Sequence, residues 1–348
     1  MTRNVVSIIR VQKDIVSSVR EGIRLVGGVE GAQGERVIVK PNLCHSSGPE
    51  TGRTTDVRVV EALLDEISAT KPREICIVES DNYSCRADRA FEKLGYVDLK
   101  KKPKVGLVNL CKVKSSPRHL QGKFFKSIEI PDVLSDYGFM VSVAKLKTHV
   151  FERFTGVYKN QYGLLPIRDR RRYHPFASEV FFDINTLYKP DLCVIDGIMG
   201  MEGCGPIDGV PKALNVLVFG RNALATDSVA CNLMGINPFK VPHLKYAWEN
   251  GMGELSLDKM EIVGEPIENL ASEFKFIPEE AFAYVRKGLT LGRYPSPLRN
   301  LGILLFTYGN LKAGEEYSTR KQRQQEDKVK VSTRRMLKKI IWTRTWNV

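Results

Sequence analysis

The stretch KLKTHVFERFTGVYKNQYGLLP, from Lys145 to Pro166, displays several nitrogen donors directly after the apolar run Phe139–Val143. Within it, His149 and Lys159 stand near glycine and aromatic residues, and Glu152 is the one acidic residue. A lysine in a partly apolar loop can lose its proton and act as a nucleophile or Schiff-base former, or it can simply clamp an anion. A neutral histidine can serve as a metal ligand or as a general base near pH 7. We predict that this stretch forms one wall of a site for an anion, a metal or a prosthetic group.

Three further polar segments follow other predicted strands. In an open parallel sheet, ligands bind outside the carboxyl ends of the strands, so all four segments are expected at one rim. The four are Lys40–Gly52, Glu79–Cys85, Ala144–Pro166 and Asp196–Pro211. At this rim we expect His149, Lys159 and Glu202 to be catalytic, with Asp196 and Asp227 as carboxylates that handle a cation or a proton. The residues expected to bind a small anionic substrate are Lys40, Asn42, Lys147, Thr148 and Asn160.

Three of the seven cysteines, Cys44, Cys85 and Cys204, fall in three of these rim segments. If their thiols converge, they form a soft site for an iron–sulfur cluster or another thiophilic metal ion, and His174 is a further candidate metal ligand. The alternative is that each cysteine is an isolated small side chain, because the spacing matches no motif. The odd and scattered cysteines, with no CxxC, indicate reduced thiols and argue against a disulfide framework.

Short β-rich runs alternate with segments of helical periodicity along most of the chain. Apolar residues recur at helical spacing in Thr55–Ile67, for example. The alternation predicts an α/β fold with a mainly parallel, Rossmann-like sheet and helices on both faces, and it leaves open a division into two subdomains. The predicted strands are Val37–Val39, Ile75–Val78, Val105–Leu110, Phe139–Val143, Leu192–Ile195 and Val216–Phe219.

The C-terminal part of the chain differs from the rest in charge. The whole chain carries a net charge of +13, of which +7 lies between Leu311 and Val348. We therefore expect an α/β domain over residues 1–290 and a basic extension over residues 291–348, which is a solvated helix, an oligomer arm or a nucleic-acid contact. Because the chain has no RNP or zinc-finger signature, we do not expect a nucleic-acid enzyme, while a homo-oligomer stays open.

The sequence gives no indication of a membrane or secretory protein. No apolar run approaches the roughly 20 residues that span a bilayer. The N-terminus lacks the apolar core and cleavage site of a secretory signal. We expect a cytoplasmic protein without a membrane span.

Five segments resemble, in the same order, the family known as domain of unknown function 362. Members of that family often occur with ferredoxin-type iron–sulfur domains, so the resemblance implies an iron–sulfur association and a ferredoxin-like partner. This chain itself has no ferredoxin-like cysteine run. The five segments are KPNL (Lys40–Leu43), KLKTH (Lys145–His149), FTGVYKNQYGLLP (Phe154–Pro166), DGIMGMEGCGP (Asp196–Pro206) and ATDSVACNLMG (Ala225–Gly235).

A more distant resemblance covers a short part of the chain. His149, Lys159 and His174, with FTGVYK between the first two, are similar to a stretch of nickel-pincer lactate racemases. That stretch holds a catalytic histidine, the lysine that anchors the cofactor and a histidine ligand of nickel, so the resemblance implies these roles in turn. This chain departs from the pattern after Glu79, where ESDNYS stands in place of a second catalytic histidine.

Two functions therefore stay open on the sequence. In the first, the protein is an enzyme for a small anionic substrate and uses Lys147, His149 and Lys159 as binding and acid–base groups. In the second, it is an electron-transfer or maturation factor that holds a cluster at the three rim cysteines and docks a ferredoxin-like partner. A non-catalytic binding module that uses the basic tail is a third reading, but it leaves the rim segments unexplained.

Overall fold

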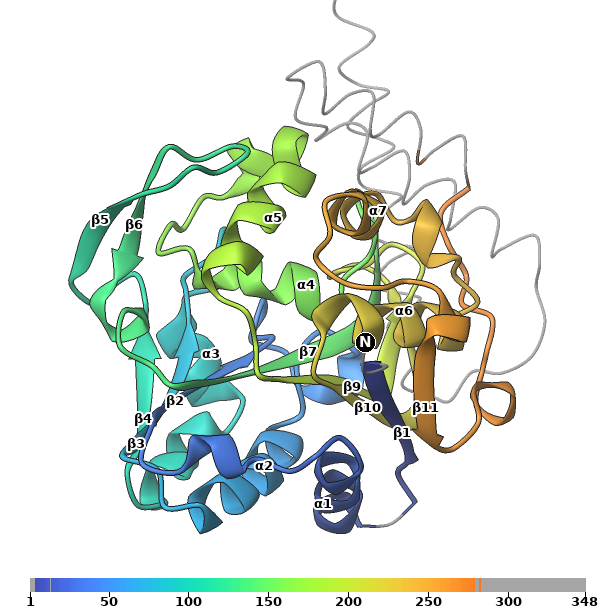
Figure 1. Ribbon diagram of the computed structural model, residues 1–348, viewed down its shortest axis with the longest axis horizontal. Coiled ribbons are helices and arrows are strands. Elements are labelled where there is room, and N and C mark those ends of the chain that lie inside the picture. Colours follow the sequence, from blue (N-terminus) through green and yellow to red (C-terminus); the bar gives the residue numbers. More distant parts are fainter. Residues whose placement is uncertain (1–3, 13, 279–281, 283–348) are drawn as a thin grey trace, which may run out of the picture.

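The fold is built on one large sheet, which a computed structural model describes for residues 4–12, 14–278 and 282. The strands lie in the order β11-β1-β10-β9-β7-β2-β3-β4, and β8 pairs with β7 outside this path (Figure 1). A second sheet contains β5 and β6. The strands are β1 Asn4–Arg10, β2 Arg36–Pro41, β3 Glu74–Glu79, β4 Val105–Asn109, β5 Ser115–His119, β6 Ser127–Pro131, β7 Phe139–His149, β8 Arg153–Phe154, β9 Leu192–Glu202, β10 Val210–Gly220 and β11 Met260–Gly264.

Most neighbouring strands of the large sheet run parallel, as the alternation predicts. β2 is parallel to β3 and to β7, and β7 is parallel to β9. β10 runs antiparallel to both β9 and β1. The carboxyl ends of β2, β3, β7 and β9 therefore meet at one edge. The six predicted runs correspond to β2, β3, β4, β7, β9 and β10, which confirms the predicted fold class.

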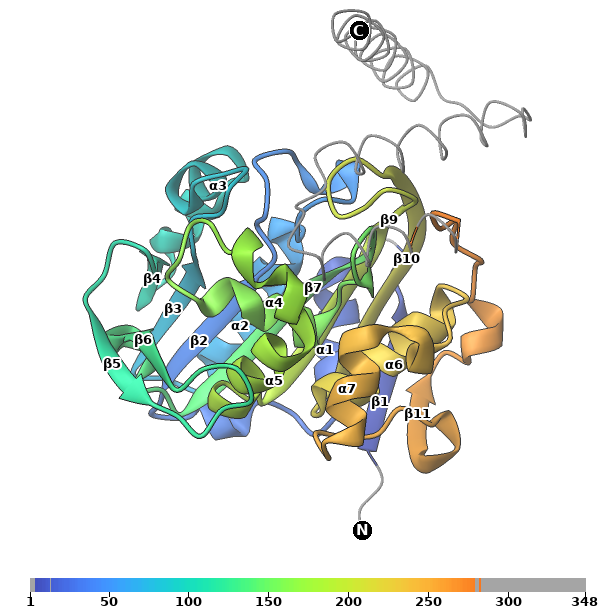
Figure 2. The ribbon, with the colours of Figure 1, turned by 90° about the horizontal axis from the view of Figure 1, so that it is seen from above.

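Helices cover both faces of the large sheet (Figures 1 and 2). Side chains alternate between the faces along a strand, so Val141 of β7 packs with α1, α2 and α3, whereas Met140 packs with α4 to α7. Each face thus has its own apolar core. The helices are α1 Ile15–Leu25, α2 Val57–Ala69, α3 Ala87–Lys93, α4 Val157–Asn160, α5 Ala177–Leu187, α6 Ala223–Leu233 and α7 Pro242–Glu249.

Two strands extend well beyond their predicted ends. β7 continues to His149 and is buried along its whole length, although a loop was expected from Ala144 onward. β9 likewise continues to Glu202, through most of the expected loop Asp196–Pro211. The predicted ends were wrong because polar side chains in these segments resemble loop residues. In the structure these polar side chains bond to buried partners, so both strands continue.

The structure describes no helix with both the length and the apolar composition that a membrane crossing requires. The expected basic extension, residues 291–348, lies outside the described residues. The domain boundary at residue 290 therefore stays a prediction.

Candidate functional site

Lys145, near the end of β7, forms a buried ion pair. Its ammonium lies 2.8 Å from the carboxylate of Asp196 on β9, and both side chains are fully buried. The same carboxylate accepts hydrogen bonds from the backbone N–H groups of Asp56 at 2.8 Å and Ile198 at 3.1 Å. A buried charge is tolerated when it is paired and hydrogen-bonded in this way. Asp196, which was expected to handle a cation or a proton, ties β7 and β9 to the start of α2.

Lys147, two residues further along β7, holds the loop that follows β2. Its Nζ donates to Asn42 Oδ1 and to the carbonyl of Arg53, both at 2.7 Å, and to Cys44 Sγ at 3.2 Å. Three acceptors match the three hydrogens of an ammonium group. Burial lowers the pKa of Lys147, and Cys44 opposes that decrease. Lys147 was expected to bind substrate, but it is 1% exposed and its donors are engaged within the protein.

Lys40, near the end of β2, is engaged in the same way. Its ammonium lies 2.7 Å from Glu79 on β3, and the two side chains are 1% and 5% exposed. Burial lowers the pKa of Lys40, and Glu79 opposes that decrease. Gly163 approaches so closely that a Cβ at this position would lie 2.7 Å from Lys40 Cε. The pair therefore connects β2 and β3 beneath the segment that follows α4.

The other predicted binding residues link the rim segments to one another. Asn42 Nδ2 donates to Asn160 Oδ1 at 3.2 Å, and Asn160 Nδ2 donates to the carbonyl of Lys40 at 3.0 Å. Thr148 Oγ1 donates to the carbonyl of Gly203 at 2.8 Å. These bonds bring the ends of β2, β7 and β9 together with α4, so the residues expected to bind substrate form the framework of the site.

Asp227 of α6 determines where α4 begins. Its buried carboxylate accepts hydrogen bonds from the backbone N–H groups of Val157 at 2.6 Å and Tyr158 at 2.9 Å. Burial raises the pKa of Asp227 to about 8. The chain enters α4 through Gly156, whose φ of 87° lies in the region that glycine tolerates. Asp227 was expected to handle a cation or a proton. In the structure its carboxylate caps α4 and so sets the position of the helical turn that carries Lys159.

A Gly156→Ala substitution is expected to lower the free energy of unfolding by about 2–4 kcal/mol, because positive-φ strain and a steric clash add together. The added Cβ would lie 2.3 Å from both Asp227 Oδ1 and Phe154 Cε1. Gly27 is the matched control, because its φ is 89° and a Cβ there meets no atom within 4 Å. Gly27→Ala should cost only about 1–2 kcal/mol. Urea denaturation measures both losses, and equal losses would show that Gly156 is not sterically required.

Lys159 differs from Lys40, Lys145 and Lys147 because it stays partly exposed to solvent. Its ammonium lies 5.6 Å from the ring centroid of Phe181 and 5.9 Å from that of Tyr162. Burial lowers the pKa of Lys159 from 10.5 to about 8; Glu152 opposes this decrease and Lys147 adds to it. Near neutral pH, a far larger fraction of this amine is unprotonated than of an exposed lysine.

His149 and His174 lie close enough to Lys159 for its charge to act on both rings. The two ring centroids are 6.4 Å apart, and the ring planes differ by 22°. Burial lowers the pKa of His149 well below its usual range and that of His174 to about 4, and Lys159 adds to both decreases. Both imidazoles are therefore neutral near pH 7. The structure thus brings His149 and His174 close to the amine of Lys159.

Two residues near Lys159 and His149 were not predicted as site residues. They are Glu152, which acts on Lys159, and His243, which acts on His149. His243 Nδ1 lies 3.0 Å from Glu152 Oε2, and both side chains are fully buried. The His243 ring stacks against Tyr158, with 6.3 Å between the ring centroids. Glu152 stood out as the one acid in its stretch, but His243 is 91 residues away along the chain and had no local signal.

Glu202, expected to be catalytic, makes its contacts elsewhere. Its Oε2 lies 3.3 Å from Lys212 Nζ on β10 and accepts a hydrogen bond from the backbone N–H of Lys275 at 3.1 Å. The carboxylate that acts most strongly on Lys159 is that of Glu152. Glu152 is thus the carboxylate that the structure places near Lys159, and a catalytic role for Glu202 stays a prediction.

The three rim cysteines have different surroundings. Burial raises the pKa of the Cys85 thiol, and Cys44 lies near enough to add to that increase. Cys44 is half-buried beside Lys147, and Cys85 is buried with its Sγ 3.3 Å from the carbonyl of Arg86. Cys204 packs in a small apolar cluster that includes Phe151. Within the described ranges, no three His, Cys, Asp or Glu side chains gather in a way that could hold a metal ion. Cys204 thus packs apart from His174, which lies beside His149. The assignment of Cys44, Cys85, Cys204 and His174 as metal ligands stays a prediction.

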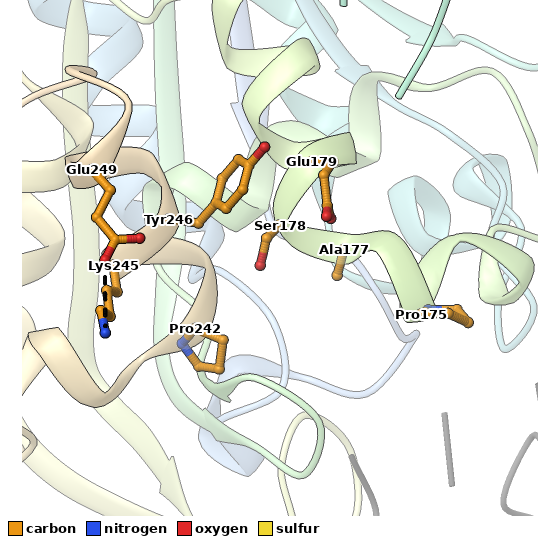
Figure 3. Close-up of a pocket in the computed structure, with 8 residues that line it drawn as sticks. All are labelled: Pro175, Ala177, Ser178, Glu179, Pro242, Lys245, Tyr246 and Glu249. Atoms are coloured by element: carbon orange, nitrogen blue, oxygen red, sulfur yellow. Dashed lines mark ion pairs between the residues drawn. The ribbon is translucent and has the colours of Figure 1, made fainter. Parts of the chain in front are cut away.

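A separate groove of about 280 Å³ lies between α5 and α7 (Figure 3). Its lining includes Glu179 and Tyr246. Figure 3 also shows Lys245 and Glu249 facing each other on α7, where they form an ion pair of 3.7 Å. The groove lacks the concentration of lysine and neutral imidazole groups found around Lys159.

Comparisons with known proteins include a family match, a curated relative and a solved structure. A family model described as "Domain of unknown function (DUF362)" matches residues 37–232. The thylakoid-associated protein sll1697 of Synechocystis sp. (strain ATCC 27184 / PCC 6803 / Kazusa) is 23% identical over 288 residues, which cover 79% of this chain and 88% of that protein. The lactate racemase apoprotein from Thermoanaerobacterium thermosaccharolyticum matches with a TM-score of 0.36 and 13% identity, over 54% of this chain and 50% of that chain. The match thus spans about half the length of the racemase chain.

Proposed function

This chain belongs to the family described as Domain of unknown function (DUF362), and from that premise we propose that it is an enzyme that acts on a small anionic carbonyl compound beside His149 and Lys159. The Lys159 amine is the group that reacts with the substrate. The framework residues Lys40, Lys145 and Lys147 hold the strand ends that surround it.

The observation that carries the proposal is the state of the nitrogen groups around Lys159. Its own pKa of about 8 leaves part of the amine unprotonated near neutral pH. An unprotonated amine adds to a carbonyl carbon or accepts a proton, whereas an ammonium does neither. The neighbouring rings of His149 and His174 are neutral and add no positive charge of their own.

The anionic character of the substrate follows from two cations that act on Lys159, namely Lys147 and Arg170. Lys147 donates to an amide oxygen, a backbone carbonyl and a thiol. Arg170 donates to three backbone carbonyls. Among the described residues, neither cation forms an ion pair with a carboxylate. Their positive charge, which Glu152 offsets in part at Lys159, favours a carboxylate or phosphate group on the substrate.

Reductive trapping with glyoxylate, which carries an aldehyde and a carboxylate, tests the proposal. The lysine nitrogen adds to the aldehyde carbon, the aldehyde oxygen leaves as water, and cyanoborohydride delivers hydride to the imine to give a stable secondary amine. Mass spectrometry of the digested protein then reports the modified fraction of each lysine.

Near neutral pH we expect Lys159 to be modified about tenfold or more faster than an exposed lysine, because a lower pKa leaves more unprotonated amine. Lys100, which is exposed in the same protein, is the internal control. Acetate in excess should slow the reaction at Lys159 and not at Lys100. Modification of Lys159 no faster than Lys100 would refute the proposed amine chemistry.

A further inference from the structure

The hydrogen bonds of His149 determine which ring nitrogen carries the proton. Its Nδ1 lies 3.1 Å from the backbone nitrogen of Phe151 and 3.3 Å from that of Glu152, and both N–H groups donate to it. A backbone N–H can only donate, so Nδ1 must present its lone pair. The neutral ring therefore carries its hydrogen on Nε2.

The surroundings of the ring also disfavour a second proton. A proton on Nδ1 would point at the two backbone N–H groups that now donate to this atom. Lys159, His174, Lys147 and His243 lie near enough for each, when protonated, to repel an added positive charge on the ring. Burial and this repulsion hold the pKa of His149 well below its usual range. The ring is therefore neutral near pH 7 and has one tautomer.

We propose that His149 is a hydrogen-bond donor to the substrate and not a general base, with its Nε2–H directed at the substrate oxygen that gains negative charge. This assignment rests on the proposed function and deepens it. When the Lys159 nitrogen adds to a carbonyl carbon, the electron pair of the C=O bond moves to the oxygen. A fixed N–H donor at that oxygen stabilises the developing charge. The sequence had suggested His149 as a general base, a role that requires a lone pair on the nitrogen that faces the substrate.

The contacts with backbone N–H groups involve only one of the two ring nitrogens of His149. They engage only the Nδ1 edge of the ring, as an asparagine side chain would do in a similar turn. No hydrogen bond to another described residue engages Nε2 of His149. A capping role and a donor role therefore use different atoms, and they can be tested separately.

The tautomer can be read directly from the full-length protein. Histidine labelled with ¹⁵N gives a long-range ¹H–¹⁵N spectrum that covers the five histidines, and the His149→Asn variant assigns the signals of His149. We expect a protonated Nε2 and an unprotonated Nδ1 that gains no proton in the pH range where an ordinary histidine titrates. A proton on Nδ1, or a second proton gained between about pH 6 and 7, would overturn the proposal.

Two variants separate the roles of the two nitrogens in the glyoxylate assay. His149→Asn keeps an acceptor for the two backbone N–H groups but has no donor at the position of Nε2. It should keep the unfolding midpoint of the natural protein and trap glyoxylate at Lys159 about tenfold or more slowly. His149→Gln restores a donor near that position and should trap about threefold faster than His149→Asn, although it loses the cap.

The outcomes distinguish this inference from the proposed function. An unchanged trapping rate in His149→Asn would overturn the donor role while leaving the amine chemistry of Lys159 intact. If the natural protein does not trap glyoxylate selectively at Lys159, the proposed function fails, and the donor assignment that rests on it fails with it. The ¹⁵N spectrum then still decides the tautomer.

Discussion

Lys159→Arg and Lys159→Met are both expected to remove the fast glyoxylate adduct from the mass spectrum of the intact protein, with initial rates lower by about a hundredfold. Arginine keeps the positive charge and offers more donors, but its guanidinium does not lose a proton near neutral pH. If Lys159 only clamped an anion, the arginine variant would react like the natural protein. A fast adduct that persists in Lys159→Arg would therefore exclude Lys159 as the reactive amine.

The pH dependence of glyoxylate trapping measures the pKa of the Lys159 amine. Because the unprotonated form reacts, the rate at Lys159 should rise with pH and reach half its maximum near the pKa of about 8. The rate at the exposed Lys100 should keep rising well above that pH. Glu152 raises the pKa of Lys159 through its charge, so Glu152→Gln should shift the half-maximum to lower pH. A shift to higher pH would show that Glu152 does not act on the amine as a negative charge.

Asp196→Ala is expected to lower the free energy of unfolding by about 3–5 kcal/mol, because it leaves the buried ammonium of Lys145 without a counter-charge. It also removes the acceptor for two backbone N–H groups, those of Asp56 and Ile198. Both members of the pair are fully buried, so water cannot replace the lost partner. Urea denaturation monitored by tryptophan fluorescence measures the loss.

Glu21→Ala is the control for a surface ion pair. Glu21 and Arg24 lie 2.8 Å apart, but their side chains are 47% and 67% exposed, so its loss should cost less than about 1 kcal/mol. If Asp196→Ala does not fold, the double variant Lys145→Met/Asp196→Leu, which leaves no unpaired charge, should recover a folded protein. Equal losses for Asp196→Ala and Glu21→Ala would show that the buried pair does not hold the strand ends together.

The central part of the sheet could be predicted from the sequence because periodicity reports local structure. The apolar runs that became β2, β3 and β7 are bounded by polar segments and separated by helical patterns. β1 and β11 were not predicted, although they pair with each other and complete the sheet beside β10. Their pairing joins residues from opposite ends of the described chain, and no local pattern reports such a contact.

The gathering of polar side chains at the rim was likewise predictable, whereas the partners of each donor were not. The sequence by itself determined that Lys145, Lys147, His149 and Lys159 follow an apolar strand segment and meet other polar segments at one edge. Only the tertiary structure decided which of them are bonded within the framework. Lys145 finds Asp196 51 residues away, and Lys147 finds Asn42 105 residues away. The physical reason is that a buried ammonium takes its acceptors from whatever segment the fold brings within about 3 Å, and sequence spacing does not encode that proximity.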